Sequence, residues 1–596
     1  MIDIHFLKRN ASMHIMYRIH SVIFIVLSVL IFCELSAKDS CRAMWLRHSC
    51  GYTNGQQLLG GNAWGEVVAA DKFGNSYNAG NFSGNWFTMD TVIEMNMNRY
   101  YINKYDRFGK RLWTSKIMGT TINSIITSNK MLCDDDGNIY ICGIMSIDDS
   151  AFLAPNWYPI GGGFIAKYDS NGNNIWCKYE TRQSSTPIVF TDMSISGNTL
   201  YACGTMGFGT SIIDGISFVS PKSQSGVIMS VSLDGQILQS EMLDTSTTTM
   251  IYGIEASKTS NAVYIVGEYL NGDVKKDGQT LTYTDNGTHS FIIAMNQTFD
   301  VQWMRKGITY IGENGGVWGS DIKCLRSIEL DSLDNIYAIG NGNGDSTVFG
   351  SLRFSHFIPK QYAQDVYIVK YDKTGKEQWL KHGGSGENDN AWDIITDKAG
   401  NSIIAVMSGF NTLYNFVFDN DSIQRYHGGL VSYDANGQLR YVKKLQEARS
   451  LRRLTWGIGS TFYGTGTGVI YKMPYDTLEI AQCEDTIHAS LANYKLVMVQ
   501  FNDERSTILG LPEADQSSGF FSNQDGTVFI PSRQMPPLYA ISLTDITGKQ
   551  ISLLESDIYQ THNGFLLNTN SLHAGVYFLK VIQNTSCAFI KMILIQ

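Results

Sequence analysis

Three short stretches combine tryptophan with carboxylate side chains in a pattern that suits a sugar or peptide ligand. They read "GGNAWGE" (60–66), "IGENGGVWGSD" (311–321) and "HGGSGENDNAWD" (382–393). Indole rings stack on apolar ligand faces, and carboxylates accept hydrogen bonds from ligand donors. Because the tryptophans recur at equivalent places, packing at the start of a strand is the competing interpretation. The residues predicted to contact a ligand are Trp64, Trp318, Glu387, Asp389 and Trp392.

Catalytic and metal motifs give no comparable signal. The chain has no GxSxG, HExxH, P-loop or Rossmann fingerprint, and no Cys/His cluster at zinc spacing. Two stretches, "DDDGN" (134–138) and "DSNGN" (169–173), place oxygens at close spacing, but neither continues as a calcium loop does. Aspartate capping of a turn explains both better. We therefore expect no metal and no cofactor, and we name no catalytic residue.

The elements that must position any site form two interleaved repeats. One repeat reads "FIAKYDSNGNNIW" (164–176), with further copies at 101–113, 366–379 and 429–441. The other reads "GNIYICG" up to Gly143, with relatives ending at Gly80, Gly204, Gly267 and Gly340. Alternating apolar residues indicate half-buried strands, and Asp and Gly at fixed offsets indicate tight reversals. Each copy is therefore predicted to be part of a β-hairpin.

Seven four-stranded units account for these repeats. The spacing of the tyrosines in the second repeat is too long for a solenoid rung but suits a propeller blade with one long loop. These tyrosines are Tyr77, Tyr140, Tyr201, Tyr264 and Tyr337. Innermost strands are expected near residues 67, 125, 190, 253, 325, 394 and 454. Outer strands are expected to carry Trp113, Trp176, Trp303 and Trp379.

The two ends of the array are complementary. The segment "RAMWLRH" around Trp45 is an outer strand with no unit in front of it, and the seventh unit lacks an outer strand after "GVIYKM". Closing a ring with a strand from the other terminus removes two exposed sheet edges. We therefore predict that the Trp45 strand pairs beside Val469–Met473.

The paired signatures resemble the β-propeller repeat of secreted bacterial proteins. The resemblance covers about residues 41–474 and implies an all-β fold, a seven-bladed β-propeller. It does not imply a reaction, because propellers carry many unrelated functions. Six long connections are expected on one face, and the short Asp/Gly turns are expected on the other.

The N-terminus has the pattern of a secretory signal peptide. A basic stretch precedes an apolar run from Val22 to Phe32, and Ala37 fits a cleavage site, so residues 1–37 are predicted to be removed. A lipid-modified Cys33 is the alternative, although Phe32 stands where a small residue is preferred. In an oxidising compartment Cys41 and Cys50 are candidates for a disulfide, and Cys142 and Cys203 fit small core positions.

The overall charge excludes some partners. The chain has 596 residues, of which 43% are hydrophobic and 17% charged, with a formal net charge of −9. The chain has no long run of Lys or Arg, so nucleic acid and anionic membranes are not expected as partners. We expect a monomer.

The C-terminal segment has a separate pattern of alternating strands and Gly-bearing turns, which predicts a small β-sandwich over residues 520–596. Residues 475–519 before it are predicted to be a linker or an ill-defined strand pair. The sandwich resembles the C-terminal sorting domain of the type IX secretion system of the Bacteroidota, although the usual "YPNP" opening is reduced to "FSNQ" (521–524). The residues that carry the resemblance are Asp545, Gly548, Lys549, Leu572, Gly575, Val576, Tyr577 and Lys591.

This resemblance implies the type IX machinery as a partner and a secreted or outer-membrane surface location. Two function classes remain open from the sequence. The first is a non-catalytic protein that binds an extracellular polysaccharide or protein, or acts as a scaffold. The second is a secreted glycan- or peptide-degrading enzyme with its acidic residues on the long-loop face.

Overall fold

The structure of the protein is a computed structural model that divides into two compact units, Met1–Ser506 and Thr507–Gln596. Side chains are described only between residues 65 and 466, with gaps. The described backbone covers residues 40–53, 56–61, 63–82, 85–88, 91–93, 99–119, 125–146, 151–153, 155–181, 187–243, 246–284, 287–310, 325–356, 364–385, 388–407, 415–419, 421–423, 428–445, 450–468, 495–504, 521–522, 527–531, 539–545, 550–551, 558–561, 564–568, 575–583 and 586–595.

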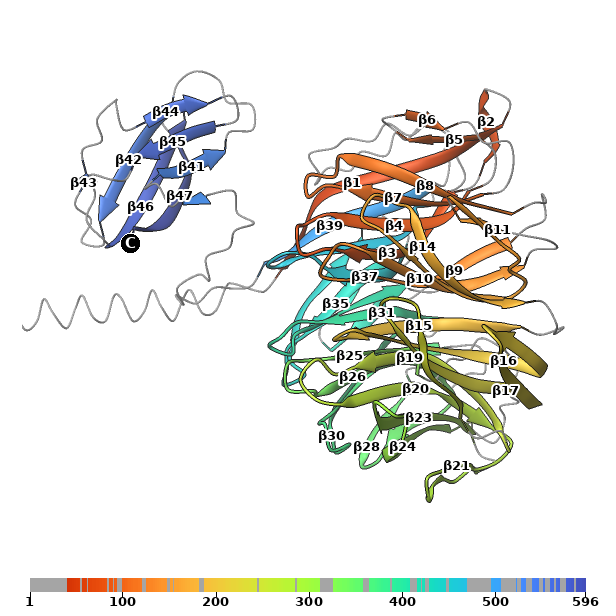
Figure 1. The fold of residues 1–596 in the computed structure, drawn as a ribbon. Coiled ribbons are helices and arrows are strands. Elements are labelled where there is room, and N and C mark those ends of the chain that lie inside the picture. Colours follow the sequence, from red (N-terminus) through yellow and green to blue (C-terminus); the bar gives the residue numbers. More distant parts are fainter. Residues whose placement is uncertain are drawn as a thin grey trace, which may run out of the picture. The chain divides into compact units, whose positions relative to one another are not determined.

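The described part of the first unit is all β and contains seven antiparallel four-stranded meanders (Figure 1). Listed from the first to the fourth strand, the first meander is β3 (Ala63–Ala70), β4 (Ser76–Phe82), β7 (Arg99–Tyr105) and β8 (Arg111–Gly119), the second is β9 (Ile125–Cys133), β10 (Ile139–Ser146), β13 (Gly163–Tyr168) and β14 (Asn174–Thr181), and the third is β15 (Ile188–Ser196), β16 (Thr199–Ile213), β17 (Ile216–Ser232) and β18 (Ile237–Met242). The fourth is β19 (Thr248–Ala256), β20 (Ala262–Leu270), β23 (Gly287–Asn296) and β24 (Val301–Tyr310), and the fifth is β25 (Ser327–Leu330), β26 (Ile336–Asn343), β29 (Gln364–Tyr371) and β30 (Glu377–Gly384). The sixth is β31 (Asn390–Thr396), β32 (Ser402–Met407), β35 (Gly428–Tyr433) and β36 (Leu439–Lys444), and the seventh is β37 (Ser450–Trp456), β38 (Thr461–Gly468), β39 (Lys495–Glu504) and β1 (Ser40–Thr53).

The first strands of the meanders contact one another in chain order, from β3 to β9, β15, β19, β25, β31 and β37. Strand β37 in turn contacts β3, so these contacts form a closed circuit, which we call the inner circuit. Six of the seven strands include the residue at which the sequence predicts an innermost strand, and β25 begins just after the remaining one.

The seventh meander takes its fourth strand from the N-terminus, as predicted, but its third strand is not the predicted one. Strand β1, which carries Trp45, pairs antiparallel with β39, and β39 pairs with β38. The predicted partner segment 469–473 lies outside the described residues. The observed third strand differs from the predicted one because β39 lies in residues 475–519, which the sequence predicts to be a linker or an ill-defined strand pair. Its run "KLVMVQF" (495–501) is a short continuous apolar stretch, which periodicity alone does not distinguish from a buried helix segment, and it has none of the turn signals of the repeat.

The strands of the repeat are more buried than their alternation suggests. All six residues of β13 and all eight of β29 are buried, whereas the fourth strands β14 and β30 are largely half-buried. A strand between two neighbouring sheets is covered on both faces, so it gains from being apolar throughout. The middle strands thus supply the core between successive meanders.

The recurring aspartates cap turns, as predicted. Asp134 Oδ1 accepts hydrogen bonds from the backbone N–H groups of Asp136 and Asn138, at 3.0 and 2.9 Å. Its Oδ2 accepts from Asn138 Nδ2 and from the Tyr140 hydroxyl, both at 2.9 Å. The same set is made by Asp71 and Asp331. One carboxylate therefore links the turn to the buried tyrosine of the next strand.

The recurring tryptophans join each meander to the next one. Trp113 Nε1 donates to the carbonyl of Ser170, and a Cβ placed on Gly172 would lie 2.9 Å from the Trp113 ring. Lys104 Nζ donates to the same carbonyl and lies 5.1 Å from the centre of the Tyr77 ring. Trp176, Trp303 and Trp379 make the equivalent bond one meander further on. The spacing of the repeat therefore encodes contacts between sheets.

Most of the long connections contain hairpins that cover the edge of the preceding sheet. Strands β11 (Ala151–Leu153) and β12 (Asn156–Tyr158) extend the sheet beyond β8. Equivalent additions are β5 (Asn85–Thr88) with β6 (Thr91–Ile93) on β1, β27 (Ser346–Phe349) with β28 (Leu352–Ser355) on β24, and β33 (Phe416–Phe418) with β34 (Asp421–Ile423) on β30. The end of the β16–β17 hairpin pairs with β14, and β21 (Val274–Lys276) with β22 (Gln279–Leu281) forms its own sheet. Paired edges resist association with other strands.

The C-terminal unit contains two antiparallel four-stranded sheets, in the region predicted to be a sandwich. One sheet consists of β40 (Phe521–Ser522), β41 (Thr527–Pro531), β45 (Gly564–Asn568) and β44 (Ile558–Thr561). The other consists of β43 (Gln550–Ile551), β42 (Tyr539–Asp545), β46 (Gly575–Gln583) and β47 (Ser586–Ile595).

A further strand, β2 (Gln56–Gly61), pairs with β1 in the first unit.

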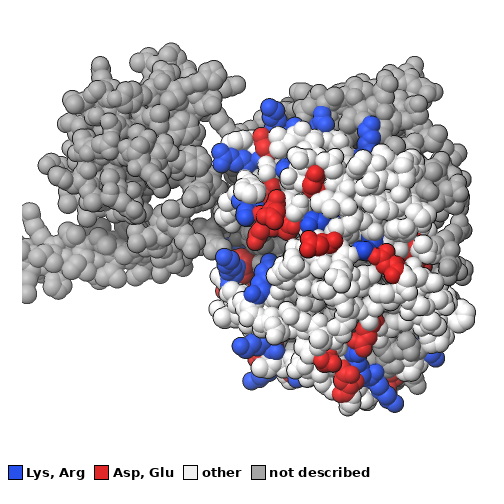
Figure 2. Space-filling view, in the orientation of Figure 1, with Lys and Arg blue, Asp and Glu red and all other residues white. Residues whose placement is uncertain are grey.

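The structure also shows where charged residues and cysteines lie. Figure 2 shows Lys and Arg interspersed with Asp and Glu over the described part of one face. No helix in the described part of the chain is long and apolar enough to span a membrane. Cys142 and Cys203 are fully buried and free, as expected for core residues. Cys41 and Cys50 both lie on β1, and their side chains are outside the described set.

Candidate functional site

Two of the five predicted ligand contacts have described side chains, and only one is partly exposed. Trp392 lies on β31 with its side chain partly exposed. Asp389 has no exposed surface, and its carboxylate accepts bonds from the backbone N–H and the hydroxyl of Ser385. Trp64 lies on β3, but its side chain is outside the described set. Glu387 and Trp318 lie outside the described residues. The structure therefore places Asp389 as a turn cap.

A β-bulge recurs in the first strand of six meanders, and the fifth has a comparable backbone arrangement at Arg326, the residue just before β25. In β31, for example, Ala391 pairs with Val406 and Asp393 with Ala405, which leaves Trp392 as the extra residue. In the fifth meander the Arg326 N–H donates to the carbonyl of Ile339, which also faces Ser327. The extra residues, here called the bulge residues, are Glu66, Asn129, Thr191, Tyr252, Arg326, Trp392 and Arg452.

The glycine of the second repeat explains the bulge. Gly143 pairs with Ser128 beside the bulge at Asn129, and a Cβ there would lie 2.0 Å from the carbonyl oxygen of Thr127. Gly267 makes the same approach to Met250 at 2.0 Å. A residue larger than glycine would require the strands to move apart. Trp64 pairs with Asn81 and precedes the bulge, so Trp64 and Trp392 do not occupy equivalent positions.

In the half of the inner circuit formed by β3, β9 and β15, each bulge residue bonds to the next first strand. Glu66 accepts from the N–H of Ser128 at 2.8 Å. Asn129 Nδ2 donates to the carbonyl of Phe190 at 2.7 Å, and Thr191 Oγ1 donates to the carbonyl of Ile251 at 2.8 Å. Each of these three polar side chains therefore has a hydrogen-bond partner on the next first strand. We call this part the bonded half.

In the half formed by β25, β31 and β37, the bulge residues are two arginines and a tryptophan. The guanidinium carbon of Arg326 lies 4.1 Å from the centre of the Trp392 ring, and that of Arg452 lies 5.2 Å from it. Trp392 Nε1 and Arg452 Nε are buried and have no hydrogen-bond partner in the described part of the chain. We call this part the arginine half.

Burial and like charges both act on the arginine half. Burial, followed by the charges of Arg453 and Arg452, lowers the pKa of Arg326 to about 9. Burial also lowers the pKa of Arg452, against the opposing effect of Glu66. With a pKa of about 9, Arg326 remains protonated at neutral pH. The cluster therefore holds adjacent positive charges at an energetic cost, which an anion would reduce.

Ion pairs lie next to the bulge residues. Lys130 Nζ lies 3.4 Å from Asp192 Oδ1, and Asp192 Oδ2 accepts from the N–H of Ile254. Arg453 lies 4.0 Å from Asp393 and also donates to the carbonyls of Trp392 and Asn129, at 3.2 and 2.8 Å. The bond to Asn129 reaches from β37 to β9, past β3. The other contacts join neighbouring first strands, so Arg453 alone among these residues ties strands that are not neighbours in the circuit.

Two glutamates on neighbouring strands add an acidic group. Burial raises the pKa of Glu255 on β19 to about 7, although Lys258 and Lys130 act to lower it. Burial and the charge of Glu255 raise the pKa of Glu329 on β25. The inner circuit thus has protonatable carboxyl groups as well as the arginine half.

A buried Thr-His-Asp arrangement has the distances of a charge-relay triad but not the access. Thr347 Oγ1 lies 3.0 Å from His356 Nε2, and His356 Nδ1 lies 3.0 Å from Asp365 Oδ2. Thr347 also pairs with Thr309 at 2.9 Å. Thr347 is 1% exposed, so a substrate carbonyl cannot reach its hydroxyl. The group holds the β27–β28 hairpin against β24 and β29.

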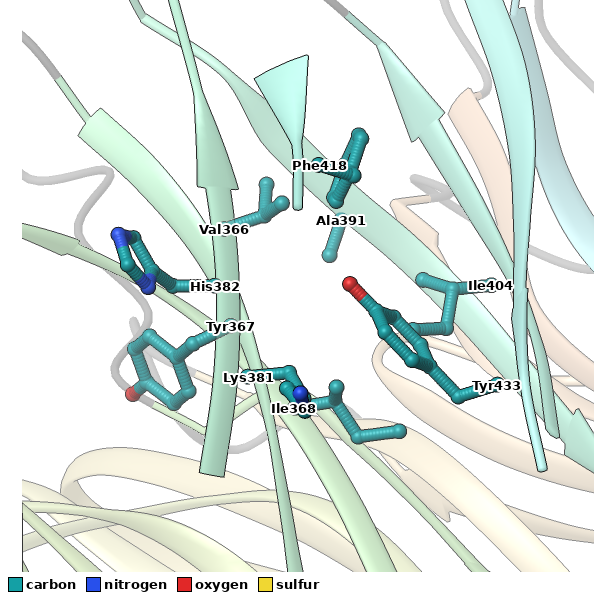
Figure 3. A pocket seen from close by; sticks show the side chains of 9 residues that line it. All are labelled: Val366, Tyr367, Ile368, Lys381, His382, Ala391, Ile404, Phe418 and Tyr433. Carbon is teal, nitrogen blue, oxygen red and sulfur yellow. The ribbon is translucent and has the colours of Figure 1, made fainter. Parts of the chain in front are cut away.

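A small apolar gap between the fifth and sixth meanders is also a poor site. Figure 3 shows its lining, in which the Tyr433 hydroxyl and the imidazole of His382 are among the few polar groups. Val366, Ile404 and Phe418 complete much of the wall, and all three are buried. A ligand site needs convergent polar groups, which this lining does not supply. We interpret the gap as imperfect packing between sheets.

Sequence reasoning identified Trp392 but not its arginine neighbours. Arg326 and Arg452 stand in stretches without tryptophan-acid patterns, and they meet Trp392 only because β25 and β37 flank β31 in the inner circuit. The available signal was the glycine of "Y-x-x-G", because it lies opposite a bulge. Locating the residue across from each glycine finds the bulge residues.

The predicted sorting residues divide between described strands and the residues outside them. Asp545 ends β42 and pairs with Tyr577 on β46. Gly575 pairs with Ile595, and Leu579 pairs with Lys591 on β47. Gly548, Lys549 and Leu572 lie outside the described residues. The two signature blocks that surround Asp545 and Tyr577 are thus adjacent strands of one sheet.

Comparison with known families identifies the C-terminal unit. The model of the secretion system C-terminal sorting domain matches residues 525–596. This match shows that the protein is exported by the type IX secretion system and is located at the cell surface or secreted. No curated protein matches the chain.

Solved structures give weaker likenesses. A protein of unknown function from Bacteroides caccae has 11% identity and a TM-score of 0.26, over 56% of this chain and 93% of that one. A member of the DUF4221 family from Bacteroides vulgatus has 12% identity and a TM-score of 0.29, over 78% and 98%. Sqt1 from Saccharomyces cerevisiae has 10% identity and a TM-score of 0.26, over 67% and 99%. At these values the likenesses assign neither fold nor function.

Proposed function

We propose that this chain is a seven-bladed β-propeller, exported through its sorting domain, that binds an extracellular ligand without catalysing a reaction. The proposal places the blades in residues 40–504, after a signal peptide at 1–37. Support for the fold comes from the seven meanders and from the contact between β37 and β3. The sorting domain would occupy about residues 520–596.

The observation that carries the binding role is the arginine half of the inner circuit. Trp392 and its two arginines are partly exposed, and the buried donors Trp392 Nε1 and Arg452 Nε lack acceptors among the described residues. An unpaired buried donor costs about 1–3 kcal/mol. Other buried polar atoms, among them Ser76 Oγ and Asn78 Nδ2, are also unpaired among the described residues, but Trp392 Nε1 and Arg452 Nε are the two that belong to bulge residues, where we propose that a ligand supplies the acceptor. Trp392 therefore stays in the proposed site, whereas the buried Asp389 leaves it.

A binding screen tests this function directly. Purified protein, collected from the culture medium or the cell surface, is applied to an array of extracellular polysaccharides and proteins. We expect at least one ligand whose binding falls tenfold or more in Trp392→Ala. Trp303→Ala is the matched control, because Trp303 also stacks with an arginine but lies on the fourth strand β24. Equal loss in both variants would contradict a site at Trp392.

The enzyme alternative is favoured by one observation, the carboxyl groups of Glu255 and Glu329 with their raised pKa values. A glycosidase uses one carboxyl group that is protonated near neutral pH as a general acid. Release of reducing sugar from any ligand found in the screen would support it. That activity must then disappear in Glu255→Gln or Glu329→Gln. If the ligand is instead recovered intact, the protein binds it without catalysis.

Export supplies a separate test. Removing residues 520–596 should leave the propeller in the periplasm of a host with the type IX machinery, because the sorting signal is lost. Fusing these residues to a periplasmic reporter should bring the reporter to the surface. Fractionation followed by immunoblotting measures both, and unchanged export of the truncated chain would refute the domain boundary.

A further inference from the structure

We propose that the arginine half of the inner circuit binds the carboxylate of a sugar acid, through Arg326, Arg452 and the indole N–H of Trp392. The inference rests on the proposed binding function and names its ligand class. It uses Trp392 on β31, Arg452 on β37 and Arg326, which directly precedes β25.

The charge balance of the arginine half calls for a negative group. Arg453 has Asp393 at 4.0 Å, whereas Arg326 and Arg452 make no ion pair with any residue whose side chain the structure describes. Glu66, the nearest acidic bulge residue, already accepts from the N–H and hydroxyl of Ser128 and from Asn81. An added carboxylate would therefore meet two guanidinium groups that form no ion pair among the described residues, although the charges of Asp393 and Glu66 act on them from a distance.

The unpaired donors fit a carboxylate in number and type. Trp392 Nε1 is a single donor, and Arg452 Nε is one of five donors on a planar fork. A carboxylate offers two oxygens with about four lone pairs, and its geometry matches the guanidinium fork. A carboxylate that accepts from both at once requires the Trp392 and Arg452 side chains to expose these two donors, which are buried in this structure.

The residues beside the arginine half favour a ligand with hydroxyl groups. Glu329 lies on β25 itself and Glu255 on the neighbouring strand β19, while Thr191, Asp192 and Lys130 lie further round the circuit on β15 and β9. Carboxylates accept hydrogen bonds from sugar hydroxyls, and they repel a ligand with many negative charges. A single carboxylate on a polyhydroxylated ring satisfies both regions, whereas a nucleic acid or a polyphosphate does not.

Ligand titration of the purified full chain tests the proposal. The probes are D-glucuronate and D-galacturonate, with D-glucose and D-galactose as neutral counterparts, and an acetylated dipeptide with a free carboxylate. Binding is measured by calorimetry and by tryptophan emission. We expect at least one uronate to bind at least tenfold more tightly than its neutral counterpart. Its binding should change the tryptophan emission, and this change should be lost in Trp392→Phe.

Matched arginine variants locate the site. Arg326→Gln and Arg452→Gln should each weaken uronate binding tenfold or more, and Arg452→Lys should recover part of the loss because it keeps the charge. Arg305→Gln is the control, because Arg305 lies 5.2 Å from the centre of the Trp303 ring, outside the inner circuit. Thermal unfolding of every variant identifies any that fail to fold.

Each result decides between the proposals. Uronate binding that survives in both folded arginine variants overturns this inference, and so does equal binding of the neutral sugars. Tighter binding of the dipeptide assigns the site to a peptide carboxylate and overturns the sugar acid. If these probes fail while the screen finds another ligand that depends on Trp392, only this inference is lost. If the screen also finds nothing, the proposed binding function is lost with it.

Discussion

The two halves of the inner circuit share one backbone geometry but treat polar atoms in opposite ways. In the bonded half, Glu66, Asn129 and Thr191 each pair with the next first strand, at 2.7 to 2.8 Å. In the arginine half, the same bulge position carries Arg326, Trp392 and Arg452, with buried donors left unpaired among the described residues. A repeated position whose contacts are satisfied serves the fold. The same position with unsatisfied contacts is where a ligand is expected.

The recurring Asp, Trp and Gly residues reinforce this lesson. They cap turns and join sheets in nearly every meander, so their repetition reflects a repeated structural need. The bulge residues, in contrast, vary from meander to meander. Repeat proteins vary freely only where the fold does not require a particular side chain, so variation at a fixed geometry is informative about function.

Removing β1 should have the largest effect, and it should abolish the comparison. Deleting residues 40–53 takes away the partner of β39 in the meander that joins β37 to β3, and with it the closure of the inner circuit. We expect a loss of several kcal/mol in the free energy of unfolding and loss of ligand binding. Denaturant unfolding measures it, with a chain that begins at Lys38 as the control. A deletion variant as stable as the control would contradict closure by β1.

Glu66→Ala should cost about 2–4 kcal/mol, because the buried N–H of Ser128 and the amide of Asn81 would lose their acceptor. Glu66→Gln keeps one acceptor oxygen and should lose less. Chemical denaturation compares the three proteins. A negligible loss in Glu66→Ala would show that the bonded half does not depend on its bulge residues.

Glu255→Gln should change how stability depends on pH. The pKa of Glu255 is about 7 in the folded protein and near its ordinary value of 4.5 when unfolded, so the folded state holds the extra proton between these values. Wild-type stability should then fall as pH rises from about 4.5 to 7, by at most about 3 kcal/mol. The variant should show a smaller fall, because Glu329 retains a pKa raised by burial. Unfolding at pH 4.5, 5.5 and 7.5 measures it, and parallel curves would contradict the assignment.

Arg452→Gln should have the smallest effect on stability. Its guanidinium has no described ion-pair partner and lies near two other arginines, so its removal should change the free energy of unfolding by less than about 0.5 kcal/mol, or raise it. This outcome, set against Glu66→Ala at the equivalent position, is the sharpest form of the comparison. A loss as large as that of Glu66→Ala would make the arginine half structural too.

Local sequence patterns were sufficient for the elements and for the C-terminal unit. The "Tyr-Asp-x-x-Gly" turns, the fourth-strand tryptophans and the strands around Asp545 and Tyr577 all fall where the pattern placed them. Such signals are local, because a turn or a strand depends on neighbours a few positions away. The pattern failed at β39, because its partner β1 comes from the opposite end of the array and its own sequence lacks the turn signals of the repeat.

The amino-acid sequence by itself determined that this protein is all β, repetitive, and equipped with a sorting domain, because each of these properties is written in short motifs. Only the tertiary structure decided that Asp389 is buried against Ser385, that the long connections largely pair as edge hairpins, and that Arg326 and Arg452 meet at Trp392. The physical reason is distance along the chain. Arg326, Trp392 and Arg452 belong to three successive meanders, and only the circuit of first strands brings them together.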